Sequence, residues 1–271
     1  MERKFTVTQI KSALNKIRNK ISEPQKSMLR AHYLYRTLSM ERIAHFGGYV
    51  GHQAGNLQYG RLCRAVARKL AFHSPYGRHY ARFVPAIASE MPERDDKGHF
   101  QWRMDDVVAK ALEELGWVVP VSSVAHEASE SEADLEGVTE TERKALINAR
   151  VGQGTFRKDV IALWGNCAVT DCSRQSVLVA SHIVPWKQAT NAERLDPFNG
   201  LLLTPNLDRL LDQCLISFND DGSMLLSKDL TAEIMAALGV SEKSKLRFVR
   251  PAALPYLRRH RELFLRRERS G

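Results

Sequence analysis

Apolar residues recur at three- and four-residue steps through the first 120 residues, a pattern that predicts helices. The first set places one apolar stripe on a helix and consists of Val7, Ile10, Leu14, Ile17 and Ile21. Further helices are expected after Pro24, from a cap at Ser39 to the Gly47-Gly48 break, over 57–72, and from a cap at Asp105 to Leu115. Residues 100–104 are expected to form a strand. The N-terminal part is therefore predicted to be mainly helical.

The pattern changes in the C-terminal half. The apolar run 177–180 predicts a strand that delivers His182 at its end, and Asn199-Gly200 predicts a turn before a second strand over 201–203. Thr204 is expected to cap a helix that Pro205 opens. A hairpin is expected over 216–226, where Asn219 to Gly222 separate two apolar runs. The fold class is therefore α+β, with a strand–loop–strand–helix unit in the second half.

Charge divides the chain further. It carries 40 Lys and Arg against 31 Asp and Glu, a formal net charge of +9. Residues 121–142 contain acids but no Lys or Arg, whereas residues 243–271 are strongly basic. We therefore expect a helical domain over 1–120 whose positive charge suits nucleic-acid recognition, an acidic linker over 121–142, a second domain over 143–235, and a basic C-terminal extension over 236–271 that packs on the second domain.

Composition excludes several classes of protein. No stretch approaches the ~20 apolar residues that cross a bilayer, so we expect no membrane contact and a cytoplasmic location. Phosphate-binding and dinucleotide-binding glycine motifs are missing from the sequence, which excludes the common nucleotide-dependent enzymes. The excess of positive charge favours a polyanionic partner.

The predicted helix over 57–72 presents basic residues on one face. With the preceding short helix and glycine turn it is similar to a helix-turn-helix, although the expected turn is long. Its arginines would then lie against DNA, or alternatively form a solvated face. They are Arg61, Arg64 and Arg68.

Residues 150–235 resemble the HNH endonucleases, the ββα-metal nuclease superfamily. The motifs that carry the resemblance are Ser181 to Trp186, Arg194-Leu195-Asp196, Asn199 to Leu203, and Asp208 to Asp212. Restriction-type HNH nucleases with an N-terminal recognition domain share this architecture. The resemblance implies a ββα-metal domain that hydrolyses phosphodiester bonds in DNA.

The resemblance also implies roles for single residues. His182 takes the place of the general base, Asn199 is a metal ligand or orients the loop of the base, and Asp208 is a direct metal ligand in the place of the last histidine of the motif. Asp212 and Ser181 are expected in the outer layer of the metal site; Asp212 is alternatively a helix-face charge, and Ser181 stands where many relatives carry Asp or His. Oxygen ligands favour Mg²⁺, with Mn²⁺ as the alternative.

Other residues complete these expectations. Arg157, Arg174, Arg194 and the C-terminal Arg258, Arg259 and Arg261 are expected to hold DNA phosphates. Cys167 and Cys172 lack the second cysteine pair that structural zinc would require, so we expect thiols and no structural zinc. The predicted function is restriction of foreign DNA, with dependence on base modification and with a homodimer on DNA as extensions. The alternative is a non-catalytic DNA-binding protein with a degenerate HNH fold.

Overall fold

Two units of the chain have their own cores. A computed structural model describes residues 5–74, 82–118 and 154–270, and contacts divide the chain into residues 1–123 and 124–271. We name these the N-terminal unit and the C-terminal unit and describe each by itself. The expected acidic linker over 121–142 lies outside the described residues.

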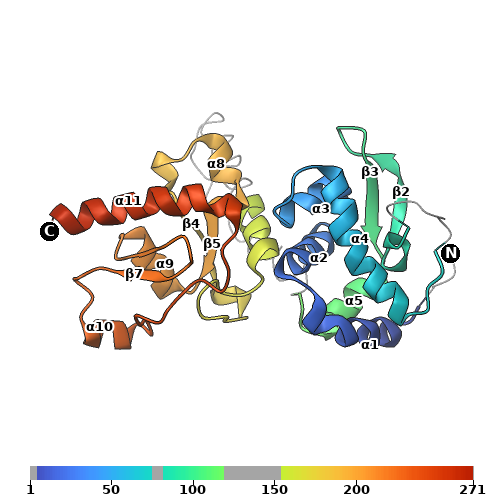
Figure 1. Cartoon of the computed structure of the whole chain (residues 1–271), viewed down its shortest axis with the longest axis horizontal. Helices are drawn as coiled ribbons and strands as arrows, with labels where there is room; N and C mark the ends of the chain where they lie inside the picture. Colours follow the sequence, from blue (N-terminus) through green and yellow to red (C-terminus); the bar gives the residue numbers. More distant parts are fainter. Residues whose placement is uncertain (1–4, 75–81, 119–153, 271) are drawn as a thin grey trace, which may run out of the picture. The chain divides into compact units, whose positions relative to one another are not determined.

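Helices make up most of the described N-terminal unit (Figure 1). The helix α1 begins with a capping box between Thr6 and Gln9 and buries Ile10, Leu14 and Ile17 against α4 and α5. This is the apolar stripe that the periodicity predicts. The helices are α1 (Val7–Ile17), α2 (Glu23–Tyr35), α3 (Met40–Phe46), α4 (Gly51–Lys69) and α5 (Asp106–Glu114).

The helix α4 starts earlier than the sequence predicts. We expected a helix over 57–72, but it begins at Gly51, so that only residues 47–50 separate it from α3. The sequence did not predict its first turns because they contain Gly51 and Gly55, and glycine has a low helix propensity. Gly55 is required by packing: a Cβ atom there would collide with the backbone oxygen of Met40. The two helices therefore approach closely, and the turn between them is shorter than expected.

A small antiparallel sheet completes the N-terminal unit. Its strands are β1 (Thr37–Ser39), β2 (Ala88–Arg94) and β3 (Phe100–Met104), in the order β1-β3-β2. Only β3 was expected. The strand β1 is too short to show alternation, and β2 carries Pro92 among polar residues, which is unusual in a strand. The N-terminal unit is therefore mixed rather than purely helical.

The buried His32 ties α2 to both α4 and the sheet. Its Nε2 atom lies 2.8 Å from the backbone oxygen of Trp102, and its Nδ1 atom lies 2.7 Å from the hydroxyl of Tyr59. Since a backbone oxygen can only accept, Nε2 carries the proton and Nδ1 accepts from Tyr59. Burial lowers the pKa of His32 from 6.5 to about 4, so the ring is neutral at physiological pH.

In the C-terminal unit, a hairpin and a helix lie around the predicted histidine (Figure 1). The strands β4 (Val179–His182) and β5 (Gly200–Leu203) pair in antiparallel fashion, and α9 (Pro205–Asp212) packs on both. A helix over 154–164 precedes them. The strand β4 begins two residues later than predicted because a 3₁₀ turn occupies Gln175–Val177. The strand–loop–strand–helix order is as predicted.

The remaining elements surround this unit. The strands β6 (Ile216–Phe218) and β7 (Met224–Leu226) form the predicted hairpin, and α11 (Leu254–Ser270) packs on β6. The short helix α8 (Asn191–Leu195) lies between β4 and β5 in the chain. The short helix α10 (Ala232–Ala237) lies between β7 and α11. Among the described residues, no helix is both long and apolar enough to cross a membrane.

We expect acid to loosen the N-terminal unit through His32. The unfolded ring takes up a proton near pH 6.5, whereas the folded ring stays neutral down to about pH 4. The unfolded state therefore binds more protons in this window, and stability falls as the pH falls, by up to about 3 kcal/mol. Hydrogen exchange of the α2 and β3 amides measures this opening free energy. A pH dependence that persists in His32→Gln would assign the effect to another group.

Candidate active site

His182 lies at the end of β4, where three contacts fix its ring. The ring stacks on Phe156, with centroids 3.8 Å apart and planes 5° apart, and meets Trp186 edge-on at 5.4 Å. Its Nε2 atom lies 2.9 Å from the backbone oxygen of Arg194. Because that oxygen can only accept, Nε2 carries the proton of the neutral ring, and Nδ1 keeps its lone pair.

The electrostatics of the site keep this lone pair available. Burial lowers the pKa of His182 below 6.5, and the carbonyl of Arg194 and the carboxylate of Asp212 oppose this effect only in part. The imidazole is therefore neutral at pH 7. A neutral histidine of fixed tautomer, with an Nδ1 atom that has no hydrogen bond within the described parts of the chain, can accept a proton from water.

Gly200 makes room for the stacked ring. It pairs directly with His182 across the hairpin, and a Cβ atom at this position would lie 2.5 Å from Cγ2 of Val160 and 2.9 Å from Cζ of Phe156. The backbone of Gly200 is extended, at φ −131° and ψ 140°. Our interpretation of Asn199-Gly200 as a turn was therefore wrong at Gly200: the glycine is required by close packing and not by a left-handed conformation.

Asn199 holds the loop between β4 and β5. Its side chain is fully buried; Oδ1 accepts from the backbone N–H of Val184 at 2.9 Å, and Nδ2 donates to the backbone oxygen of Glu193 at 3.0 Å. The loop begins directly after His182 and supplies the Arg194 oxygen. Both ends of the amide thus fix the segment that orients the histidine.

The two aspartates of α9 lie one helical turn apart. Asp208 is partly exposed and Asp212 is exposed. Partial burial raises the pKa of Asp212, and the negative charge of Asp208 raises it further. His182 and Asp212 also interact electrostatically, so Asp212 lies near the imidazole. A cation beside the carboxylates would relieve their repulsion.

This donor set fits a magnesium-type ion. No three His, Cys, Asp or Glu side chains of the described residues form a ready-made metal cluster. Mg²⁺, however, keeps several of its waters and is bound through one or two carboxylates. Asp208 and Asp212 can meet that requirement, which makes a site with few protein ligands chemically reasonable.

Ser181 lies apart from these groups. Successive side chains of a strand point to opposite faces, so Ser181 and His182 face opposite sides of β4. The Ser181 hydroxyl is buried, and its Oγ atom has no hydrogen-bond partner among the described residues. This placement gives no support to the outer-layer role expected from the sequence.

The arginines expected on DNA phosphates differ in their surroundings. Arg157 donates to the backbone oxygens of Leu178 and Gln175, at 2.7 and 3.1 Å. Arg194 donates to the backbone oxygen of Trp186 and lies over its ring. Both side chains therefore hold the backbone segments on either side of His182 in place. Arg174 is exposed, and its Nε donates locally to Ser176.

The basic residues of α11 lie in ion pairs with acids of the same unit. Arg258 and Arg261 pair with Asp220, at 2.7 and 2.9 Å. Arg259 pairs with Glu193 at 2.5 Å, and Tyr256 donates to Asp196 at 2.7 Å. These last two contacts attach α11 to the loop that carries Asn199. The helix α11 therefore helps to hold the loop of the site in place, a role that its positive charge alone did not predict.

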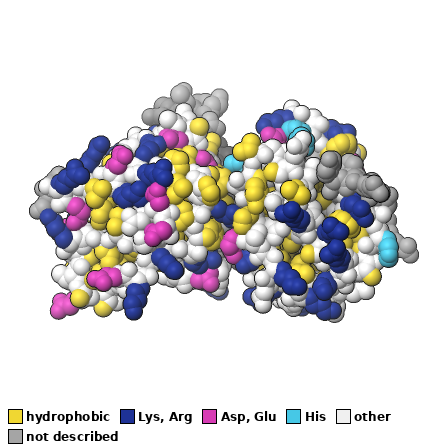
Figure 2. All heavy atoms as spheres, in the orientation of Figure 1, with side chains coloured by type: hydrophobic (Ala, Val, Ile, Leu, Met, Phe, Trp, Pro, Cys, Tyr) yellow, Lys and Arg dark blue, Asp and Glu magenta, His cyan; other side chains and the backbone are white. Residues whose placement is uncertain are grey.

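In the N-terminal unit, Arg61, Arg64 and Arg68 are all exposed on α4. Figure 2 shows Lys and Arg side chains gathered on one face of this unit. The guanidinium of Arg64 lies 5.6 Å from the ring centre of Phe83. The three residues thus share a solvent-facing surface, as the helical spacing predicts.

The cysteines differ in burial but share one chemical state. Cys63 and Cys167 are buried, whereas Cys172 and Cys214 are partly exposed, and all four are free thiols. Burial raises the pKa of the Cys63 thiol beyond its ordinary range. The Cys63 thiol is therefore un-ionised at neutral pH.

Comparison with known families agrees with this geometry. The family model described as HNH endonuclease matches residues 167–219, which include β4, the loop, β5 and α9. The C-terminal unit thus contains an HNH domain. No curated protein matches the chain.

Sequence reasoning did not find three features of the site. No spacing pattern pairs Phe156 with His182, yet Phe156 forms the stacking surface for the histidine. The Arg194 contact comes from a backbone oxygen, which no side-chain pattern can reveal. Gly200 could have been found by asking which residue pairs with His182 in an antiparallel hairpin, since that position needs a small side chain.

We expect Gly200→Ala to disturb the stack of Phe156 on His182. The added methyl group must displace Val160 and Phe156, which costs about 1–3 kcal/mol in the free energy of unfolding. With less burial, the pKa of His182 should rise toward 6.5. Urea denaturation and NMR titration measure the two effects. Gly154→Ala is the matched control, since a Cβ atom there contacts nothing within 4 Å; equal behaviour of both variants would contradict this account.

Proposed function

We propose that the protein is a metal-dependent DNA endonuclease in which His182 is the general base. The observation that carries the proposal is the fixed, neutral imidazole with its Nδ1 lone pair, in an HNH domain whose helix α9 carries Asp208 and Asp212. Nδ1 takes a proton from water as the oxygen of that water attacks phosphorus. The bond from phosphorus to the leaving oxygen then breaks, and the leaving oxygen takes a proton from a solvent water, which gives a phosphate end and a hydroxyl end.

Asp208 is the proposed direct ligand of a divalent cation, with Asp212 beside it. The cation would supply positive charge for the phosphate and for the leaving oxygen. Oxygen donors favour Mg²⁺ over softer ions. Of the two roles considered for Asn199, its contacts favour orientation of the loop, because both ends of its buried amide bind backbone groups.

DNA contact is proposed for the exposed arginines. Arg174 in the C-terminal unit and Arg61, Arg64 and Arg68 on α4 are solvent-facing and can approach phosphates. Arg157 and Arg194 would act mainly by holding the loop and strand that carry the histidine. Restriction of foreign DNA is the proposed biological role, by analogy with nucleases that combine a recognition domain with an HNH domain.

The first test is removal of the proposed base. We expect His182→Ala to reduce DNA cleavage in Mg²⁺ by about 10²- to 10⁴-fold, because proton abstraction from water is lost, with DNA binding unchanged. A plasmid-nicking assay and a binding assay in EDTA measure the two. His73→Ala, at an exposed histidine, is the control. Binding without cleavage by the wild type under any divalent ion would establish the alternative, a non-catalytic DNA-binding protein.

The wild-type pH profile provides a second test. Since burial lowers the pKa of His182, the active neutral form persists below pH 6.5. We expect the cleavage rate to be insensitive to pH near neutrality and to fall only at more acid pH. Single-turnover rates across the pH range measure this limb. A rate that already falls by half above pH 6.5 would contradict the assignment of this limb to His182.

The roles of Asp208 and Asn199 can be separated by metal titration. We expect Asp208→Asn to raise the Mg²⁺ concentration at half-maximal rate by at least about tenfold. Asn199→Ala should leave that concentration unchanged but lower the free energy of unfolding by about 1–3 kcal/mol, because buried backbone groups lose their partners. Asp221→Asn is the control, since this exposed aspartate contacts Ser223 locally. Rescue of Asn199→Ala by added Mg²⁺ would make Asn199 a ligand.

Two extensions of the function have their own readouts. Cleavage of modified but not of unmodified plasmid DNA would support dependence on base modification. Cutting of both strands by a domain with one site generally needs two protomers, so a homodimer on DNA is proposed. Light scattering that finds only monomers on a cleavable duplex would exclude the dimer.

A further inference from the structure

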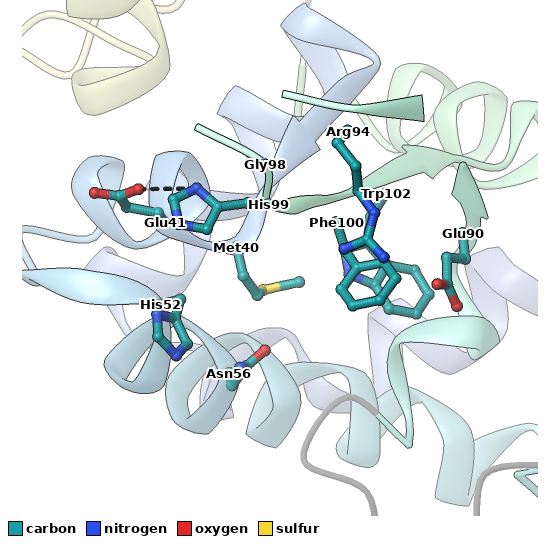
Figure 3. A pocket seen from close by; sticks show the side chains of 10 residues that line it. All are labelled: Met40, Glu41, His52, Asn56, Glu90, Arg94, Gly98, His99, Phe100 and Trp102. Carbon is teal, nitrogen blue, oxygen red and sulfur yellow. Dashed lines mark ion pairs between the residues drawn. The ribbon is translucent and has the colours of Figure 1, made fainter. Parts of the chain in front are cut away.

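A pocket of about 410 Å³ opens in the N-terminal unit between the β2–β3 hairpin and the helices α3 and α4 (Figure 3). Its volume falls within the range of about 300–1,000 Å³ that is usual for binding sites of small organic groups. None of the residues proposed for DNA cleavage or phosphate contact lines it. The residues that define its chemistry are Met40, Asn56, Glu90, Arg94, Phe100 and Trp102.

Flat aromatic surfaces form one wall of the pocket. Trp102 is 5% exposed and therefore fixed in the core, whereas Phe100 is 51% exposed. The guanidinium of Arg94 lies over the Phe100 ring, 3.2 Å from its centre, as Figure 3 shows. A planar group thus already stacks on this ring. The sulfur-bearing side chain of Met40 faces the same space and adds a deformable apolar contact.

Polar groups lie at the edges of this surface. Figure 3 places Glu90 beside Trp102, and Asn56 on the opposite side, on α4. An ionised carboxylate only accepts hydrogen bonds, while an amide both donates and accepts. Together they suit a flat ligand that has an amino group and an acceptor on its edge. Cytosine, adenine and guanine have this combination, whereas thymine has no amino group.

The pocket is held in shape by local structure. The register of β2 against β3 shifts between Glu90 and Arg94, an irregularity of the type that redirects side chains near functional sites. The hairpin turn is fixed by Asp95, which accepts from the backbone N–H groups of Lys97 and His99. The His99 ring lies 3.2 Å from Glu41 of α3, which joins the hairpin to the helix. The walls are therefore preorganised.

We infer that this pocket receives an amino-bearing base (cytosine, adenine or guanine) turned out of duplex DNA. The base stacks on the aromatic wall, where it replaces the Arg94 guanidinium, and its amino group donates to Glu90. The exposed Arg94 then reaches the neighbouring phosphate. Enzymes that turn out a base read it in this way, by stacking and by hydrogen bonds to its edge. The inference rests on the proposed function for its ligand, since the HNH domain of the same chain makes DNA the expected substrate.

The test uses the full chain with His182→Ala, in EDTA, so that binding is measured without cleavage. The probes are duplex pools with randomised flanks that differ only at one central position. This position carries cytosine, 5-methylcytosine, adenine, N6-methyladenine, guanine or an abasic site, and each base is either paired or mismatched. Fluorescence anisotropy measures the affinity for each pool.

We expect at least one base to bind about tenfold more tightly than the abasic site, through stacking. Its affinity should rise further when it is mismatched, because less pairing energy is lost. Phe100→Ala should remove this preference, and Glu90→Ala should weaken it, because the base amino group loses its acceptor. Leu57→Ala should keep it, since Leu57 is similarly exposed, at 53%, and does not line the pocket.

Equal binding of every pool, or equal behaviour of Phe100→Ala and Leu57→Ala, would overturn the inference. Cleavage of plasmid DNA by the wild-type chain in Mg²⁺ is measured in parallel. Cleavage without base discrimination would reject the pocket and keep the nuclease. Base discrimination without cleavage would reject the nuclease and keep the pocket.

Discussion

The hydrogen bond between Nε2 of His182 and the backbone oxygen of Arg194 is the constraint on which the site depends. It fixes the tautomer and leaves Nδ1 to accept a proton. The oxygen is in place only because the loop between β4 and β5 has a defined shape. Asn199 holds that loop from within, and Tyr256 and Arg259 of α11 hold it from outside.

The same constraint explains the neighbouring packing. Phe156 stacks on the histidine ring, which fixes the orientation of the ring and partly shields it from water. This stack is possible because Gly200 has no side chain in that space. Burial then lowers the pKa of His182 and keeps the ring neutral. The carboxylates of α9 add negative charge beside a neutral base, a combination suited to holding a cation without protonating the histidine.

The N-terminal unit uses a different kind of rigidity. His32 joins α2, α4 and the strand that carries Trp102, and Gly55 lets α3 and α4 pack closely. These contacts hold Trp102 and Met40, which line the aromatic pocket, without using the basic face of α4. The proposed DNA-backbone contacts of the exposed arginines and the proposed base site thus use two different surfaces of one unit.

The sequence by itself determined the strand–loop–strand–helix order, the His182 position, the hairpin over 216–226 and the stripe of α1, because local spacing and a short-range motif encode them. It did not determine the strands β1 and β2, the start of α4 or the role of Gly200. A short polar strand forms only when a partner satisfies its backbone, and a glycine required for space cannot be distinguished from one required for a turn until its neighbours are known. The carbonyl of Arg194 and the stack on Phe156 join segments that only tertiary packing brings together, so the chemistry of the histidine was decided there.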